Sequence, residues 1–310
     1  MKLAHSVLVT GAGGFLGRYV SRQFANEGWR VVGVDRLSAE AVSMRPGSTY
    51  HQMDLPDPTF GYLLAAERPQ VCVHCAGRAS VPFSMEEPAA DFRDSVGLTF
   101  EVLDALRIHN PGCRFLLLSS AAVYGNPESL PISESHRIAP LSPYGFHKRQ
   151  GEVLCEEFAR VYAMETASVR IFSAYGPGLR RQVVWDICER VLTGKPLTLN
   201  GSGAESRDFI HAADVARALA ILAREAPCEA ESYNLATGRE VAIRDLAALI
   251  ASVLQPEVHA QFDGRSRPGD PANWRADITR IQALGFTPSV PLEQGIRTVA
   301  TWASAELAAQ

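Results

Sequence analysis

Two residues four positions apart, Tyr144 and Lys148, are well suited to move a proton. They lie at the start of a helix predicted over residues 144–162, where positions i and i+4 share one face. A tyrosine ordinarily loses its proton at about pH 10, and a nearby cation such as the lysine favours the phenolate and lowers that pKa. Tyr144 could then take a proton from a substrate hydroxyl while a hydride leaves for a nicotinamide cofactor.

A pair of serines ends the apolar strand predicted over residues 114–119. The run from Leu118 to Gly125 reads Leu-Ser-Ser-Ala-Ala-Val-Tyr-Gly. At the carboxyl end of the strand, the hydroxyl of Ser120 could hydrogen-bond the same reacting oxygen as Tyr144. A Tyr-x-x-x-Lys pattern alone is common on ordinary helices. Its combination with this strand end and with a glycine-rich turn at residues 11–17 favours proton and hydride chemistry.

A glycine-rich turn follows the first apolar strand, which is predicted over residues 6–10. Gly11, Gly14 and Gly17 lead into a helix expected over residues 15–27. Glycine permits a positive φ and a close approach of a ligand, and a helix N-terminus attracts phosphate. A second apolar run ends at Asp35, whose carboxylate can accept a hydrogen bond from a ribose 2′-hydroxyl. This carboxylate would repel a 2′-phosphate, although Arg36 could partly offset the repulsion, and the pattern favours NAD over NADP.

These residues need a parallel sheet to bring them together. Six apolar strands alternate with helices as far as residue 172, and a long helix is expected over residues 89–109. The predicted fold is α/β, a Rossmann-type doubly wound parallel sheet with a smaller C-terminal substrate-binding lobe. We expect residues 1–172 to form the NAD-binding domain, with 209–238 returning to it, and residues 173–208 and 239–310 to form the lobe.

Composition and charge exclude several function classes. The chain has 310 residues, is 46% hydrophobic and carries a net charge of −4 with scattered lysines and arginines, so neither nucleic acid nor a membrane surface is an expected partner. No long apolar run or signal peptide precedes the first strand, and we expect a cytoplasmic protein. Cys72 and Cys75 are three apart on a buried strand and should point to opposite faces, so we expect no metal or redox pair.

The order of these motifs resembles the extended short-chain dehydrogenase/reductase family, specifically its nucleotide-sugar epimerase/dehydratase branch. The resemblance covers essentially the whole chain and rests on Thr10-Gly-x-x-Gly-Phe-x-Gly17, Asp54-Leu55, His74-Cys-Ala-Gly77, the Ser-Ser-x-x-Val-Tyr-Gly run, Ser142-Pro-Tyr-Gly-x-x-Lys148, Arg170-x-Phe-x-x-Tyr-Gly-Pro177, Arg207-Asp-Phe-Ile-His-x-x-Asp214, Tyr233-Asn-Leu-Ala-Thr-Gly238 and Arg267-Pro-Gly-Asp270.

The resemblance assigns roles to individual residues. It implies that Ser120, Tyr144 and Lys148 are catalytic. It implies that NAD contacts the last two of these together with Gly11, Gly14, Phe15, Leu16, Gly17, Asp35, Arg36, Asp54, Leu55, Ala76 and Gly77. Arg207 and Arg267 would hold the diphosphate of a nucleoside-diphosphate sugar, since the planar guanidinium matches phosphate oxygens. The other residues expected at the substrate are Ser80, Ser84, Ser173 and Asp270.

The resemblance leaves several reactions open. We favour NAD-dependent epimerisation at C4 of a UDP-sugar through a 4-keto intermediate. The alternative is an NAD(P)H-dependent reductase of nucleoside-diphosphate 4-keto-6-deoxysugars. A 4,6-dehydratase is disfavoured because Ala121 and Ala122 stand where that subfamily has acidic residues. A non-catalytic NAD-binding scaffold is disfavoured because such relatives usually lose the tyrosine or the lysine.

Two residues depart from the family pattern, and one surface is expected to pair. Ser173 stands where the family usually has an asparagine that contacts the diphosphate, and Asp94 also replaces an asparagine. The helices at 89–109 and 144–162 resemble those through which the family forms dimers, which makes a homodimer the expected assembly.

Overall fold

One parallel sheet organises the chain in the computed structural model, which describes residues 5–265, 269 and 271–309. Across these residues the sheet has seven strands in the spatial order β11 (Glu229–Leu235), β6 (Thr166–Ile171), β5 (Arg114–Ser120), β4 (Val71–His74), β1 (Ser6–Thr10), β2 (Arg30–Asp35) and β3 (Thr49–Gln52). All neighbouring pairs are parallel, so the carboxyl ends share one edge. The strand order reverses between β1 and β4, where ligands bind in such sheets.

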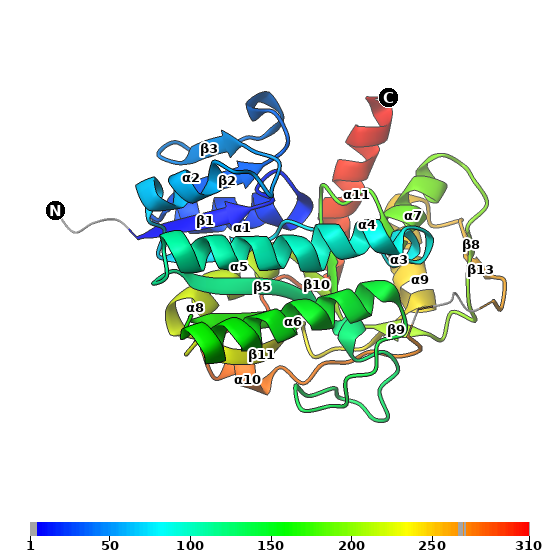
Figure 1. Ribbon diagram of the computed structural model, residues 1–310. Helices are drawn as coiled ribbons and strands as arrows, with labels where there is room; N and C mark the ends of the chain where they lie inside the picture. Colours follow the sequence, from blue (N-terminus) through cyan, green and yellow to red (C-terminus); the bar gives the residue numbers. More distant parts are fainter. Residues whose placement is uncertain (1–4, 266–268, 270, 310) are drawn as a thin grey trace.

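Helices cover both faces of this sheet, as near-continuous apolar strands require. One core contains residues of α1 (Phe15–Asn26) and α8 (Ala212–Glu225). The core on the other face contains residues of α2 (Phe60–Glu67), α5 (Leu98–His109) and α6 (Pro143–Tyr162). Figure 1 shows α5 and α6 side by side across the near face of the sheet. Cys72 packs in the second core and Cys75 against the first, which confirms that they point to opposite faces.

The predicted helix over residues 89–109 has three parts. It consists of α4 (Pro88–Phe92), a π-helical turn (Arg93–Gly97) and α5. A π turn inserts one extra residue into a helix and often marks a functional site. Asp94, one of the departures from the family pattern, lies within this turn. It forms an ion pair with Arg78, in which Nε and Oδ2 are 2.5 Å apart.

Most of the remaining elements form a lobe beyond the carboxyl ends of the strands (Figure 1). Its core is made by α7 (Gln182–Leu192), α9 (Ile243–Leu254) and α11 (Leu292–Ala308). Short strand pairs border it: β7 (Ser173–Tyr175) with β10 (Phe209–His211), β9 (Ser206–Arg207) with β12 (Val241–Ala242), and β8 (Thr198–Leu199) with β13 (Gln261–Phe262). The short helices are α3 (Val81–Glu86) and α10 (Thr279–Gln282), with 3-10 turns at Ala39–Ala41 and Ala121–Val123.

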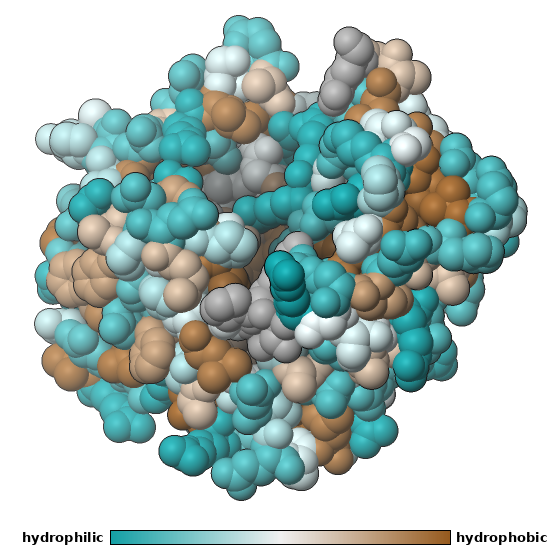
Figure 2. Space-filling model, turned by 90° about the vertical axis from the view of Figure 1, so that its right-hand side faces the viewer, coloured by the Kyte–Doolittle hydropathy of each residue, from teal (hydrophilic) through white to brown (hydrophobic). Residues whose placement is uncertain are grey.

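The sheet and the lobe present a hollowed face. Figure 2 views the molecule toward the carboxyl ends of the strands, and the surface is recessed near its centre. The fold confirms the predicted α/β class with its doubly wound parallel sheet. The strand predicted at residues 233–236 starts earlier, at Glu229, and pairs with β6 as the seventh strand. No helix within the described residues is both long enough and apolar enough to cross a bilayer.

Candidate active site

The glycine turn between β1 and α1 is too tight for side chains. Gly11 has a φ of +67°, and a Cβ there would lie 2.7 Å from the backbone nitrogen of Ala76. A Cβ on Gly17 would lie 2.0 Å from the carbonyl oxygen of Gly11. Gly14 caps the N-terminus of α1, whose first N–H groups lack intrahelical acceptors. Because the glycines carry no side chains, a phosphate can approach the backbone N–H donors of this turn. The turn lies at the point where the strand order reverses.

A carboxylate lies beside this turn, as the dinucleotide prediction requires. Asp35, at the end of β2, accepts the N–H of Gly13 at 2.9 Å and that of Leu37 at 3.1 Å. A carboxylate has about four acceptor positions, so these two bonds orient the group and leave room for ribose hydroxyls. Arg36 is exposed next to it. The close-approach turn, the helix N-terminus and the oriented carboxylate together fit a bound NAD.

The other residues expected at the cofactor surround the same edge. Phe15 and Leu16 lie in the first turn of α1, and both are half-buried. Asp54 is exposed after β3, and Leu55 is half-buried against the core beneath α2. Ala76 and Gly77 follow β4, and Gly77 has a φ of +122°. All of them lie at or just beyond strand carboxyl ends, but their contact with the cofactor stays a prediction.

Ser120, Tyr144 and Lys148 come together at the end of β5. Ser142 caps α6 by accepting the N–H of Gly145 at 3.3 Å, which places Tyr144 in the first helical turn. Tyr144 is 9% exposed, and Ser120 lies close enough to its phenol to lower the pKa of that group. Lys148 Nζ donates to the carbonyl oxygen of Leu118 at 2.8 Å and lies 5.9 Å from the centre of the Tyr144 ring.

The electrostatics of this site differ from the expectation in one respect. Burial raises the pKa of Tyr144, whereas the hydrogen bond from Ser120 and the charge of Arg181 lower it. Lys148 directs its ammonium to the carbonyl of Leu118, and its expected lowering of the Tyr144 pKa stays a prediction. Burial lowers the pKa of Lys148 to about 8, and the nearby Asp91 opposes that effect.

Two buried groups that were not among the candidate site residues lie around the lysine. Burial and the charge of Lys148 lower the pKa of His74 to about 3, so this side chain is neutral and shares a hydrogen bond of 2.8 Å with Thr10. Asp91 is fully buried on α4 and contacts His147 Nδ1 at 2.6 Å. The available sequence signal for the contact between Asp91 and His147 was the histidine itself, which lies between Tyr144 and Lys148.

Arg181 is the third residue that the sequence alone did not single out. It is exposed, lies just before α7, and places its charge close enough to act on Tyr144 across the site. The sequence feature that could have indicated Arg181 is the pair of adjacent arginines, Arg180 and Arg181, after the turn at Gly176–Gly178. Which way their side chains point depends on how the lobe packs.

The residues expected at the substrate are only partly brought together. Ser80 caps α3 by accepting the N–H of Phe83 at 3.3 Å. Ser84 is fully buried, donates to the carbonyl of Val81 at 2.8 Å and accepts the N–H of Tyr144 at 3.0 Å. Its hydroxyl thus links α3 to the start of α6, and the expected contact of Ser84 with the sugar stays a prediction.

The residues expected at the diphosphate lie on the lobe side. Ser173 is half-buried at the start of β7. Arg207 donates to the carbonyls of Ser206 at 2.8 Å and Ala272 at 3.2 Å, with its guanidinium over the ring of Trp274. Arg267 and Asp270 lie outside the described residues.

Comparison with known proteins agrees with this geometry. The family model for the NAD dependent epimerase/dehydratase family matches residues 7–236. A UDP-glucose 4-epimerase of Mycolicibacterium smegmatis is 32% identical over 309 residues, covering 93% of this chain and 95% of that protein.

Two solved structures are similar over nearly the whole chain. The UDP-glucose 4-epimerase of Thermus thermophilus, in complex with NAD, has a TM-score of 0.87 at 27% identity and covers 96% of this chain and 98% of that one. The UDP-N-acetylglucosamine 4-epimerase of Methanobrevibacter ruminantium has a TM-score of 0.88 at 26% identity and covers 98% and 99%. With a dinucleotide turn, an oriented ribose carboxylate and a Ser-Tyr-Lys set at one sheet edge, this chain belongs to the NAD dependent epimerase/dehydratase family and is an NAD-dependent enzyme.

Proposed function

We propose that this protein interconverts the C4 epimers of a nucleoside-diphosphate sugar, with UDP-sugars as the substrate class, through a transient 4-keto intermediate. The observation that carries the proposal is the buried Tyr144 phenol, with Ser120 close enough to act on it and Lys148 one helical turn further along α6. The alanines at 121 and 122 place no acid at the strand end for the elimination of water. Relatives at 26–32% identity whose names state UDP-sugar 4-epimerase activity support it.

The residues of this site divide the work of such a reaction. The phenolate of Tyr144 accepts the proton of the C4 hydroxyl, and the Ser120 hydroxyl hydrogen-bonds the same oxygen. Lys148 keeps a positive charge next to the phenolate. NAD⁺, when bound, supplies a reversible hydride acceptor for C4. Tyr144 holds the proton while the substrate is a ketone and returns it to the oxygen, so that no net oxidation remains.

Cofactor and product analysis tests the proposal. The purified protein is denatured, released cofactor is quantified, and the folded protein is offered UDP-glucose, UDP-N-acetylglucosamine, a UDP-uronate and the GDP- and dTDP-hexoses. We expect NAD in amounts comparable to the protein, and a C4 epimer formed without added NADPH. Steady oxidation of NADPH with a nucleoside-diphosphate 4-keto-6-deoxysugar, and no epimer from any sugar, would instead establish the reductase alternative.

Arg181→Met is expected to move the pH dependence of turnover. Activity requires the phenolate, so turnover rises with pH through the pKa of Tyr144. The charge of Arg181 lowers this pKa, so its removal raises the pKa, and the rising limb moves to higher pH. The effect is modest because Arg181 is exposed to screening water. The measurement is kcat against pH.

The matched control for this variant is Arg180→Met. Arg180 is the neighbouring arginine and pairs with Glu306 of α11. We expect the control to leave the rising limb in place. A limb that moves equally in both variants, or in neither, would contradict the assigned influence of Arg181 on Tyr144.

We also propose that the protein pairs through α5 and α6. Six apolar side chains on these helices are between 42% and 65% exposed: Phe100, Ile108, Phe146, Val153, Val161 and Tyr162. The two helices lie side by side (Figure 1), so two copies related by a twofold axis would cover this face with a four-helix arrangement.

Val153→Glu is expected to convert the dimer to a monomer, because Val153 lies near the middle of α6 and a buried unpaired carboxylate opposes association. Sedimentation equilibrium measures the mass of both forms. Leu37→Glu serves as the control, since Leu37 is 38% exposed and lies outside these helices. A wild-type protein that sediments as a monomer at all concentrations would refute the pairing.

A further inference from the structure

A third ionisable residue lies on the catalytic face of α6 and has no part in the mechanism above. Tyr144, Lys148 and Glu152 follow one another at intervals of four and share one face of the helix. Glu152 is 1% exposed. A carboxylate is rarely buried to this extent unless several donors compensate for its lost hydration.

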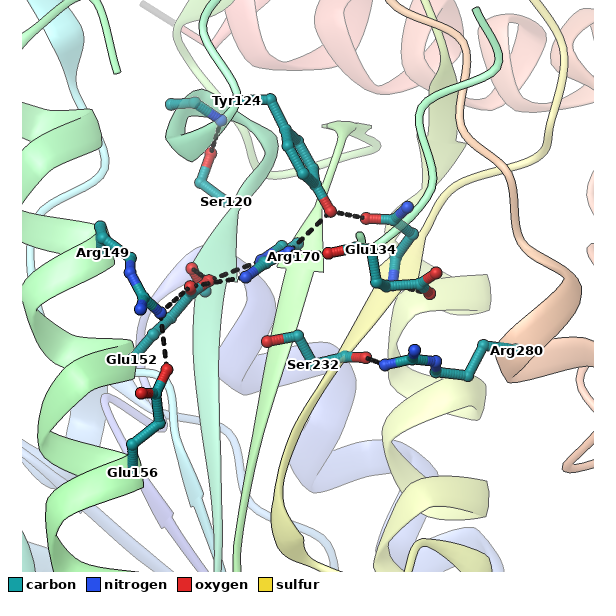
Figure 3. Close-up of polar contacts among 12 residues, drawn as sticks. Ser120, Tyr124, Glu134, Arg149, Glu152, Glu156, Arg170, Ser232 and Arg280 are labelled. Atoms are coloured by element: carbon teal, nitrogen blue, oxygen red, sulfur yellow. Dashed lines mark hydrogen bonds and ion pairs between the residues drawn. The ribbon is translucent and has the colours of Figure 1, made fainter. Parts of the chain in front are cut away.

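Glu152 receives donors from three elements (Figure 3). Arg170 of β6 binds it with both ends of the guanidinium, Nε to Oε1 and Nη2 to Oε2, each at 2.9 Å. The hydroxyl of Ser119, at the end of β5, donates to Oε1 at 2.6 Å. Arg149 of α6 donates to Oε2 at 3.2 Å. The carboxylate thus joins the catalytic helix to both strands beneath it.

Arg170 extends these contacts away from the helix. It is 4% exposed, and its Nη1 donates to the hydroxyl of Tyr124 at 2.8 Å and to the carbonyl of Glu134 at 3.0 Å. Tyr124 in turn donates to Asn234 of β11 at 2.7 Å. Within the described part of the chain, none of these side chains has a buried polar atom without a partner. The arginine is therefore held from both sides, and its position is fixed independently of α6.

The bonds to Glu152 lie next to the atoms that the reaction needs. Ser119 precedes Ser120, and Lys148 is one turn before Glu152 and binds the carbonyl of Leu118, also on β5. A shift or rotation of α6 would stretch these bonds and the Ser120–Tyr144 contact together. Apolar side chains would hold the helix against the sheet equally well, since a buried ion pair is often no more stabilising than a hydrophobic replacement. What an apolar pair lacks is a fixed direction and register.

We propose that Glu152 and Arg170 are positioning residues that set the register of α6 against β5, so that the Tyr144 phenol meets the Ser120 hydroxyl. Neither residue touches the reacting atoms. The proposal rests on the epimerase function proposed above, in which this contact places the proton acceptor.

The test replaces both charges together, in Glu152→Leu/Arg170→Met. Removing one partner alone would leave a buried unpaired charge, whereas removing both keeps volume and avoids that penalty. We expect a melting temperature, NAD content and KM close to the wild type, with a kcat lower by about tenfold to a hundredfold, since a small misplacement of reacting groups has effects of that order. Wild-type kcat in a folded, NAD-loaded double variant would overturn the proposal.

Two single variants keep the proposal falsifiable if the double variant does not fold. Ser119→Ala removes the hydroxyl bond between β5 and Glu152 and leaves the ion pair intact. Glu152→Asp keeps the charge but shortens its reach by one methylene. We expect kcat to fall in both variants, with a smaller change in KM. An unchanged kcat in both variants would overturn the proposal. Glu156→Leu is the control, because Glu156 binds Arg149 one turn further on at 2.7 Å and is half-buried; its kcat should stay within about twofold of the wild type.

A spectroscopic measurement separates this inference from the proposed function. The tyrosinate absorbance of each variant is titrated and compared with the same variant carrying Tyr144→Phe, which isolates the Tyr144 phenol. The Ser120 contact lowers the pKa of this phenol, so its loss should move the titration to higher pH in the double variant and not in Glu156→Leu. An unmoved titration would count against the positioning role, even if the wild type proves to catalyse a different reaction.

Discussion

Replacing Tyr144 by phenylalanine is expected to lower turnover by about a hundredfold to ten-thousandfold, the range that general acid–base groups contribute. The substitution removes one oxygen from a side chain that is 9% exposed, and the ring keeps its packing. In the proposed reaction the lost atom is the proton acceptor for the C4 hydroxyl. Because that interaction strengthens only as the proton moves, the loss should fall on kcat more than on KM.

The measurement is the rate of epimer formation by the purified variant, with bound NAD and the melting temperature recorded beside it. Tyr233→Phe is the matched control, since it also removes a phenolic hydroxyl, one that donates to Glu231 on β11 at 2.9 Å. We expect the control to retain wild-type turnover. If the Tyr144 variant binds NAD and keeps turnover within about tenfold of the wild type, another group takes the proton and the mechanism is wrong.

Gly17→Ala is expected to abolish NAD binding and to lower the melting temperature. A Cβ at this position lies 2.0 Å from the carbonyl oxygen of Gly11 and 2.8 Å from its carbonyl carbon. Both are backbone atoms, and Gly11 cannot retreat because its own α-carbon faces the backbone of Ala76. The turn must therefore open, which costs about 1–3 kcal/mol or more by analogy with overpacked cores and moves the donors that would bind the phosphates.

Cofactor content and stability check this prediction. NAD is quantified after denaturation of the variant, and melting is followed with and without added NAD. Gly112→Ala is the control, because a Cβ there meets nothing within 4 Å and its φ is ordinary. We expect the control to retain full NAD content and the Gly17 variant to gain no stability from added NAD. A Gly17 variant with a full complement of NAD would refute the tight-turn account.

Local patterns predicted the parts of the site that depend on local structure. The glycine turn, Asp35 and the Ser-Ser strand end are each read from a few neighbouring residues, and the parallel sheet brings strand ends together by its topology. Tyr144 and Lys148 needed only the helical repeat. For this reason the edge of the sheet and the Ser-Tyr-Lys set could be placed from the sequence.

Partners distant in the sequence could not be predicted in this way. Glu152 is four residues after Lys148, and helical spacing alone favours an ion pair between them. The structure pairs it instead with Arg170, whose strand lies between two other strands and gives its guanidinium few other acceptors. A charged residue inside an apolar strand was the signal, because a buried charge requires a partner. Arg181 depends on the packing of the lobe, which no local pattern describes.

The outer position of β11 has a consequence for how the protein is made. Before β11 is present, β6 is an edge strand with unpaired backbone groups, the kind of edge that recruits other chains. The roughly 60 residues between the end of β6 and the end of β11 take roughly 3–12 s to synthesise at about 5–20 residues per second. The strand that completes the sheet is also the one whose Asn234 holds Tyr124 and, through it, Arg170. Newly made chains thus pass through an interval in which the sheet can aggregate, and the support beneath the catalytic helix is completed only when that interval ends.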